Sequence, residues 1–148
     1  DMAPFKFTKA ILNGDPIDVY NHGDMSRDFT YIDDLVNGMR LLIDVSPGAS
    51  YAATGNLDKV DSKSHVAPFR VVNIGNSKPT KLLDFVGSFE KAIGIKAVKN
   101  FMSMQEGDVP ATWADTSLLE ELTGYKPNTD LFIGVQKFVG WYRDYHNV

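Results

Sequence analysis

The hydrophobic positions at the start of the chain follow two different spacings. Residues 5–12 place apolar side chains three or four positions apart, as on one face of a helix, with Asp1 at the position of an N-cap and a turn sequence over residues 13–16. Residues 17–20 alternate apolar and polar side chains, which is typical of a half-buried strand, and residues 21–24 have the composition of a loop. The pattern therefore predicts a helix followed by a strand.

A second extended segment is predicted over residues 27–31. The apolar positions of residues 32–44 then trace one face of a helix that ends before a Pro-Gly pair. Residues 46–68 are rich in Ala, Gly, Ser, Asp and Lys and show no sustained period, so they are expected to form a long mobile loop.

Strands and helices alternate in the rest of the chain. Residues 70–75 have the near-continuous β-branched character of a strand buried on both faces, and a helical period over residues 81–93 follows. The remaining predicted elements are a strand over residues 97–101, a short helix over residues 116–123 and a longer amphipathic helix over residues 130–145. This alternation predicts the α/β class, although the strands are too few for a complete doubly wound sheet.

Composition narrows the class of protein. A chain of 148 residues with 43% hydrophobic and 23% charged residues suits one soluble globular domain over residues 1–148. The net charge is -4 and the lysines and arginines are scattered, so nucleic acid is not expected as a partner. No apolar stretch approaches the roughly 20 residues of a membrane span, so no membrane association is expected either.

Several kinds of site are not expected in this chain. Without cysteine there can be no disulfide, thiolate nucleophile or Cys-ligated zinc, which fits a cytoplasmic protein. His22, His65 and His146 are far apart and have no partners at metal-ligand spacing, so no metal site is predicted. None of the twelve glycines lies in a G-x-G-x-x-G or related spacing, so no dinucleotide site is predicted.

Two motifs carry a resemblance to a known family. Residues 25–34, MSRDFTYIDD, resemble the R-D-F-x-Y-x-x-D stretch of extended short-chain dehydrogenases that act on nucleotide sugars, and residues 104–115, MQEGDVPATWAD, resemble their G-D-x-P-x-x-x-A-D loop. Among these enzymes, residues 4–11 and 16–21 are most similar to UDP-glucuronate 4-epimerases. The resemblance covers most of the chain and fails in the predicted loop and at Glu106, where such epimerases often have proline.

This resemblance implies the C-terminal, substrate-binding lobe and the last strand-helix units of a Rossmann-like fold, without the N-terminal cofactor-binding part. In the family that part binds NAD, which transiently oxidises C4 of the sugar, and the base is the tyrosine of a Tyr-x-x-x-Lys helix. No tyrosine of this chain has lysine four positions later, so no catalytic or cofactor-binding residue is expected in it. The chain alone is expected to be inactive, and the full-length enzyme is expected to be a homodimer.

The resemblance favours one reaction and leaves others open. It implies the interconversion of UDP-glucuronate and UDP-galacturonate, which supplies precursors of polysaccharides. Nucleotide-sugar dehydratases and UDP-glucuronate decarboxylases share the same substrate lobe and are one alternative. A non-catalytic nucleotide-binding module that retained only this lobe is another.

Two charged residues of the motifs are the first candidates for substrate binding. The resemblance assigns Arg27 to the diphosphate, because a planar guanidinium can bond two phosphoryl oxygens at once. An ordinary surface ion pair with a nearby carboxylate is the alternative. Asp108 is assigned to the ribose hydroxyls; a turn in which its side chain bonds its own backbone would also suit the Gly-Asp-Val-Pro sequence, and the two roles can coexist.

Three further positions complete the predicted UDP-sugar site. Gln105 stands where UDP-galactose epimerases carry an arginine that reaches the phosphates, and its amide can bond phosphate or ribose without bringing charge. Asp18 and Tyr20 match positions from which family members offer backbone groups to the uracil edge, and Tyr20 can also stack. A plain edge-strand tyrosine is the alternative for Tyr20.

Overall fold

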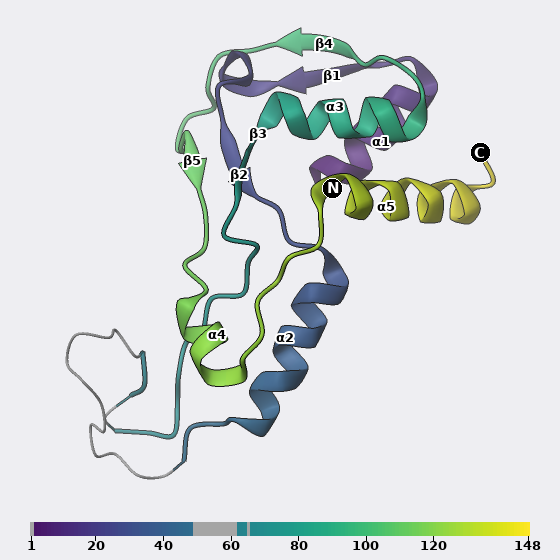
Figure 1. Ribbon diagram of the computed structural model, residues 1–148. Coiled ribbons are helices and arrows are strands. Elements are labelled where there is room, and N and C mark those ends of the chain that lie inside the picture. The colour runs from purple at the N-terminus through teal and green to yellow at the C-terminus, as the bar shows by residue number, and fades with distance from the viewer. Residues whose placement is uncertain (1, 49–61, 65) are drawn as a thin grey trace.

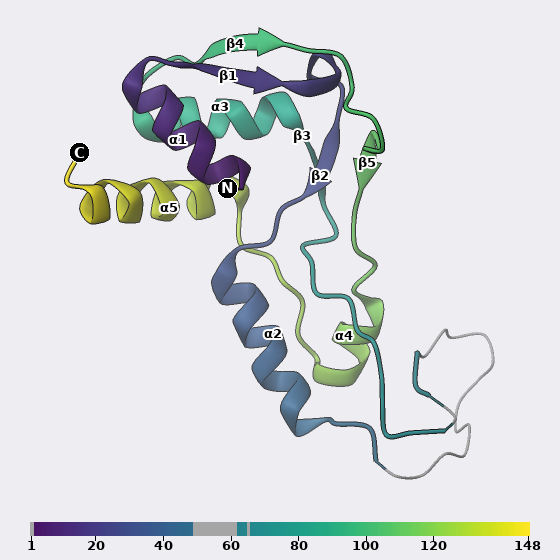
Figure 2. The ribbon, with the colours of Figure 1, turned by 180° about the vertical axis from the view of Figure 1, so that it is seen from behind.

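The computed structural model describes residues 2–48, 62–64 and 66–148 (Figure 1). In chain order the elements are α1 (Ala3–Asn13), β1 (Pro16–Val19), the 3-10 turn η1 (Tyr20–Gly23), β2 (Ser26–Asp28), α2 (Ile32–Asp44), β3 (Pro79–Lys81), α3 (Leu82–Ile93), β4 (Val98–Phe101), β5 (Ala111–Thr112), α4 (Ser117–Thr123) and α5 (Leu131–His146). Figures 1 and 2 show these elements in two groups joined by β2, β3 and β5. We call α1, β1, β4, α3 and α5 the core lobe, and α2, α4 and the described part of residues 62–77 the arm.

The core lobe buries most of the apolar side chains that the helical periods predict. β1 pairs in parallel with β4, and the two strands lie over α3, which packs against α1 and α5. Phe89 of α3 makes edge contacts with Phe7 and Phe85, and Phe85 stacks on Phe29 with 3.8 Å between ring centroids. Burial of one such aromatic side chain stabilises a fold by about 1.5–3 kcal/mol, so this cluster dominates the stability of the lobe.

A second sheet connects the core lobe with the arm. Its order is β3-β2-β5, with β2 antiparallel to β3 and parallel to β5. At the end of β2, the Asp28 carboxylate accepts hydrogen bonds from the backbone amides of Asn76, Ser77 and Ala114. Gly75 is required beside it, because a Cβ atom there would lie 2.6 Å from Cβ of Ala114 and 2.8 Å from the Asp28 carboxylate.

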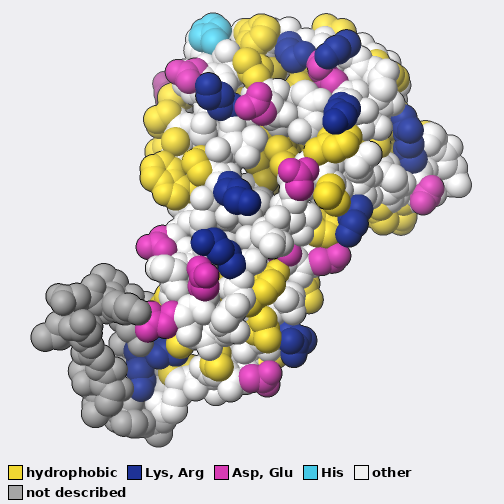
Figure 3. All heavy atoms as spheres, viewed as in Figure 1, with side chains coloured by type: hydrophobic (Ala, Val, Ile, Leu, Met, Phe, Trp, Pro, Cys, Tyr) yellow, Lys and Arg dark blue, Asp and Glu magenta, His cyan; other side chains and the backbone are white. Residues whose placement is uncertain are grey.

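The arm combines helix packing with a buried polar network. α2 packs against α4, and the buried Asp34 carboxylate accepts from the Tyr125 hydroxyl and the Thr129 amide, both at 2.9 Å. Burial raises the pKa of Asp34, but hydrogen bonds from Thr129 and Tyr125 outweigh it, so the pKa lies below its usual value. Apolar side chains of α2 remain on the surface, among them Val36, and Figure 3 shows apolar side chains exposed over this part of the molecule.

Most of the predicted helices are present, and their ends follow the expected chemistry. Asp130 caps α5 by accepting from the amides of Phe132 and Ile133. Gly124 ends α4 in the left-handed conformation. The helices α3, α4 and α5 each begin one residue later than predicted, at Leu82, Ser117 and Leu131, and the N-cap of α1 is Met2, while Asp1 lies outside the described residues.

The prediction of a strand over residues 70–75 is wrong. These residues form neither helix nor strand, and Val71 is 56% exposed. Its amide donates to Oγ of Ser62, because no other described strand lies beside this segment to complete a ladder. A β-branched run becomes a strand only when a neighbouring strand pairs with it.

Smaller differences concern the two N-terminal strands and the loop. β1 ends at Val19, so Tyr20 belongs to η1, where Asn21 and His22 have positive φ angles of 48° and 51°. β2 runs over Ser26–Asp28 instead of residues 27–31. Residues 49–61 and 65 of the predicted mobile loop lie outside the described residues, and the described residues between 46 and 68 form no helix or strand.

Candidate functional site

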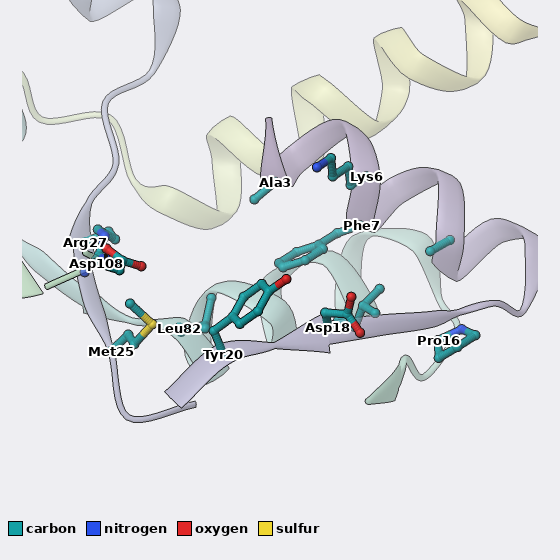
Figure 4. Close-up of a pocket in the computed structure, with 12 residues that line it drawn as sticks. Ala3, Lys6, Phe7, Pro16, Asp18, Tyr20, Met25, Arg27, Leu82 and Asp108 are labelled. Carbon is teal, nitrogen blue, oxygen red and sulfur yellow. Dashed lines mark hydrogen bonds and ion pairs between the residues drawn. The ribbon is translucent and has the colours of Figure 1, made fainter. Parts of the chain in front are cut away.

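A cavity of about 400 Å³ opens in the core lobe where α1, β1, β2 and the start of α3 meet. Four of the five predicted substrate-binding residues line it: Asp18, Tyr20, Arg27 and Asp108. Figure 4 shows Arg27 beside Asp108 at one end, Tyr20 projecting from the end of β1, and Asp18 farther along the same strand. Gln105 is exposed and is not among the residues that line the cavity.

Arg27 and Asp108 come from motifs 81 residues apart and form an ion pair in this structure. Nη2 of Arg27 lies 2.7 Å from Oδ1 of Asp108, while Nη1 donates to the Ser26 carbonyl at 2.9 Å. The two side chains are 26% and 35% exposed. The ion pair considered as the alternative role of Arg27 is therefore present. These two bonds use two of the five N–H groups of the guanidinium, so three can still meet a ligand.

Asp108 lies in a turn that is stabilised by hydrogen bonds of its side chain and its backbone amide to neighbouring residues. Its Oδ1 also accepts from the Val109 amide at 2.8 Å, its amide donates to the Gln105 carbonyl, and Gly107 before it has φ +82°. The self-bonding turn proposed as an alternative is thus present too. Among the described residues no hydrogen bond reaches Oδ2, which remains able to accept from a hydroxyl.

The backbone of β1 has an open edge beside the cavity. Among the described strands β1 pairs with β4 alone, and the Val19 carbonyl points toward that partner, because it accepts from the Met102 amide at 3.0 Å. Successive residues of a strand direct their backbone groups to opposite edges, so the N–H and C=O of Asp18 point to the open edge. The Asp18 side chain accepts from Nδ2 of Asn100 and is held toward β4.

Lys6 also lines the cavity and was not predicted. It extends from α1 above Tyr20 and Asp18, and among the described residues no hydrogen bond or ion pair reaches its Nζ (Figure 4). The sequence could have indicated this position for Lys6. Ala3, Lys6 and Ala10 fall on one helical face, and the two small side chains leave room beside the lysine.

The described residues provide neither a metal site nor a membrane span. No group of three or more His, Asp or Glu side chains there lies close enough together to hold a metal ion. Over the same residues, no helix is long and apolar enough to cross a membrane. On the face in Figure 3, Lys and Arg side chains are interspersed with Asp and Glu.

Comparison with known proteins identifies the family of this chain. The model of the family described as GDP-mannose 4,6 dehydratase matches residues 5–138. The chain belongs to this family. It is 51% identical over 142 residues to a probable UDP-glucuronate 4-epimerase of Rhizobium meliloti (strain 1021), covering 96% of this chain and 41% of that protein. It is 44% identical over 151 residues to UDP-glucuronate 4-epimerase 4 of Arabidopsis thaliana, covering 99% of this chain and 33% of that protein.

The chain is also similar to a solved epimerase structure. The chain is 28% identical to UDP-glucuronic acid 4-epimerase from Bacillus cereus in complex with UDP-glucuronic acid and NAD, with a TM-score of 0.77 over 98% of this chain and 40% of that chain. This confirms the predicted α/β class, the partial extended short-chain dehydrogenase fold and NAD as the cofactor of the family. The chain spans less than half the length of these relatives.

Proposed function

We propose that this chain is the UDP-sugar-binding part of a UDP-glucuronate 4-epimerase, which interconverts UDP-glucuronate and UDP-galacturonate. The observation that carries the proposal is the meeting of Arg27 and Asp108 in one cavity beside the open edge of β1. Their motifs are far apart in the sequence, and the fold brings together a cation for phosphate and a carboxylate for ribose. The similarity to proteins named UDP-glucuronate 4-epimerase supports this choice of substrate.

The chemistry of the cavity suits each part of UDP. Arg27 offers a planar set of charged donors to the diphosphate, and Lys6 adds a second cation from α1. Asp108 offers a carboxylate oxygen to the ribose hydroxyls. The N–H and C=O of Asp18 at the open edge of β1 complement the acceptor and donor atoms of the uracil edge, and the Tyr20 ring provides a surface on which a base can stack.

The reaction itself is proposed for the whole protein. The residues of this chain do not fit NAD, because its glycines form no turn of the kind that cradles a dinucleotide and it has no Tyr-x-x-x-Lys pair. We propose that the cofactor and the catalytic base belong to the remainder of the protein, and that this chain alone is inactive. For the whole enzyme we propose a homodimer, from the family resemblance, and a cytoplasmic location, with which the lack of cysteine in this chain agrees.

A dehydratase is the second candidate function, because the matching family model is described as GDP-mannose 4,6 dehydratase. Such an enzyme would recognise guanine where a UDP-sugar enzyme recognises uracil. A UDP-glucuronate decarboxylase would share the UDP contacts and differ in the remainder of the protein. A non-catalytic nucleotide-binding module would share them too, but its full-length form would turn over no sugar.

The test is a titration of the chain with UDP, GDP and uridine, followed by NMR. UDP is expected to shift signals of the cavity residues, and GDP is expected to bind much more weakly. Arg27→Ala should weaken UDP far more than uridine, because it removes a phosphate contact. Arg40→Ala is the matched control, since Arg40 lies on α2 away from the cavity. Tighter binding of GDP than of UDP would favour the dehydratase, and UDP binding unaffected by Arg27→Ala would contradict the site.

A further inference from the structure

The outward face of α5 carries large apolar side chains that no other described element covers. α1 and α3 pack against one side of α5, whereas its other side lies at the edge of the core lobe (Figures 1 and 2). Ile133 and Trp141 are each 49% exposed, and Tyr145 is 69% exposed. The inner side of the helix buries three other residues, Val135, Val139 and Tyr142. α5 therefore has two apolar faces, and the described chain buries one of them.

The aromatic rings of this outward face are held in position by their neighbours. Trp141 stacks on Tyr145 with 5.4 Å between ring centroids and an interplanar angle of 24°. Its ring also lies 5.7 Å from the ring of Phe138. Such contacts restrict the tryptophan before a partner arrives, which lowers the entropic cost of binding. Trp and Tyr are also the side chains that often dominate the affinity of a protein interface.

Gly140 lies in the middle of the same face, and no packing among the described residues requires a glycine there. A Cβ atom at Gly140 would meet no atom within 4 Å, and the residue is exposed. Gly134 of the same helix differs, since a Cβ there would lie 3.2 Å from Cδ2 of Tyr31. Glycine inside a helix is destabilising relative to alanine, but it allows another backbone to approach closely. Gly140 therefore favours a second helix as the partner of this face.

Charged side chains lie on both sides of Gly140. Helical spacing places Lys137 before it and Asp144 after it on the outward face. Nζ of Lys137 is 3.9 Å from Oδ2 of Asp33 and 4.9 Å from the centre of the Tyr31 ring, and the lysine side chain is 56% exposed. Asp144 is exposed, and among the described residues no ion pair or hydrogen bond reaches its carboxylate. The face is thus positive at one end and negative at the other.

We propose that a second copy of this chain binds to this face, with the two α5 helices antiparallel and related by a two-fold axis between Gly140 and Trp141. In such a pair, residues at equal distances on opposite sides of the axis lie at the same level. Lys137 then faces the partner's Asp144, and Asp144 faces the partner's Lys137. Trp141 faces the partner's Gly140, where the missing side chain leaves room for the indole ring. The inference uses no substrate contact and does not depend on the proposed function.

A contact through one helix from each copy is small. Stable interfaces bury about 1,200–2,000 Å² in total, and exposed ion pairs add little to their affinity. We therefore expect a reversible dimer with a dissociation constant on the order of 0.1 mM. Its charge contacts should make it weaker at high ionic strength.

Gly140→Arg tests the close approach of the two helices. The arginine has room within one copy, so folding should be unaffected, but it should collide with the partner's Trp141 and weaken the dimer by roughly tenfold or more. Gly87→Arg on α3 is the matched control. A Cβ atom at Gly87 likewise meets no atom within 4 Å, and the residue lies on another helix, so the dimer should be unchanged.

Reversal of the charges tests the antiparallel arrangement. Asp144→Lys alone places a lysine opposite Lys137 on both sides of the axis, and it should weaken the dimer by roughly three- to tenfold. Lys137→Glu alone should have a similar effect. The double variant Lys137→Glu/Asp144→Lys restores two contacts of opposite charge and should recover most of the affinity. In a parallel pair, where each residue faces its own copy, the single reversals would have no such effect.

The experiment is sedimentation velocity of the unmodified chain and the five variants at roughly 10–500 µM, after circular dichroism has shown that each is folded. A dimer that is lost in Gly140→Arg, kept in Gly87→Arg and recovered in the double variant would support the proposal. A chain that stays monomeric, or a dimer that Gly140→Arg leaves unchanged, would overturn it. In the latter case, loss of the dimer in Val36→Asp would assign the contact to α2. Failure of the double variant to recover the dimer would overturn the antiparallel arrangement.

Discussion

The core lobe and the arm contain helices of similar amphipathic pattern but bury them very differently. In the core lobe, α3 lies between other helices and strands, and Phe89 and Val86 are fully buried. In the arm, α2 has an equally regular apolar stripe, yet Val36 is 55% and Ile43 74% exposed. A helical period therefore predicts which side chains share a face, and burial depends on whether another element covers that face.

The two regions also use their buried carboxylates differently. Glu90 in the core lobe is bonded by the ammonium groups of Lys96 and Lys99 and by the Ala97 amide. Asp34 in the arm is bonded by neutral donors, among them the Tyr125 hydroxyl and the Thr129 amide. The core lobe thus pairs its buried carboxylate with charged groups, whereas the arm places its buried carboxylate in a small network of neutral donors beside the buried Leu119.

The largest expected effect is on the free energy of unfolding, and it should differ between the apolar face of α3 and that of α2. Phe89→Ala removes a ring that contacts Phe7, Phe85 and Phe138, and it should lower the free energy of unfolding by about 3–5 kcal/mol. Val36→Ala on the exposed face of α2 should change it by about 0.5 kcal/mol or less. Urea unfolding followed by circular dichroism measures both. Equal losses would show that the face of α2 is covered in solution.

Acid should weaken the core lobe through Glu90. Burial raises the pKa of Glu90, but hydrogen bonds from Lys96, Lys99 and the Ala97 amide outweigh it and lower the pKa to about 2. A lowered pKa stabilises the fold above the usual value of 4.5, and this contribution, at most about 3 kcal/mol, is lost as the pH falls from 4.5 toward 2. Glu90→Gln should flatten the dependence of unfolding free energy on pH in this window.

The control for Glu90 is Glu120→Gln. Glu120 pairs with Lys126 at 3.5 Å on the surface, with both side chains about half exposed, so its loss should leave the pH dependence nearly as it is in the unmodified chain. If both substitutions flatten the curve equally, the acid sensitivity does not come from the buried carboxylate.

A smaller and more local effect is expected at Asp34. Asp34→Ala leaves the Tyr125 hydroxyl and the Thr129 amide without their acceptor, at a cost of about 1–3 kcal/mol. Because the network lies in the arm, hydrogen exchange of α2 and α4 should accelerate more than exchange of α3. Asp33→Asn, next along the same helix and exposed, is the control. A uniform acceleration over both regions would mean that the arm and the core lobe unfold as one unit.

The smallest expected effect tests whether the ligand uses the core lobe alone. Lys6→Met should weaken UDP by roughly two- to fivefold, because it removes an unpaired cation from the cavity. Lys9→Met on the same helix lies outside the cavity lining and should leave the affinity unchanged, as should Val36→Ala in the arm. Titration with UDP compares the three variants. Weaker binding by the arm variant would extend the site beyond the core lobe.

The sequence was sufficient for features that depend on a few neighbouring residues. The helical periods located α1, α2, α3 and α5 to within a few residues, and the caps at Asp130 and Gly124 were readable because capping is a local interaction. Two short motifs were enough to indicate the family, since each carries several specified residue types at defined spacing. The predicted substrate-binding residues came from that family resemblance and not from periodicity.

The tertiary structure was needed wherever distant segments meet. The contact of Arg27 with Asp108, the place of Lys6 in the cavity and the exclusion of Gln105 from it depend on how β2, α1 and the turn before β5 pack together. Residues 70–75 have the composition of a strand, and they form none because strand formation requires hydrogen bonds to another segment. A helix completes its backbone hydrogen bonds within one segment, whereas strand pairing and the assembly of a site depend on the whole fold.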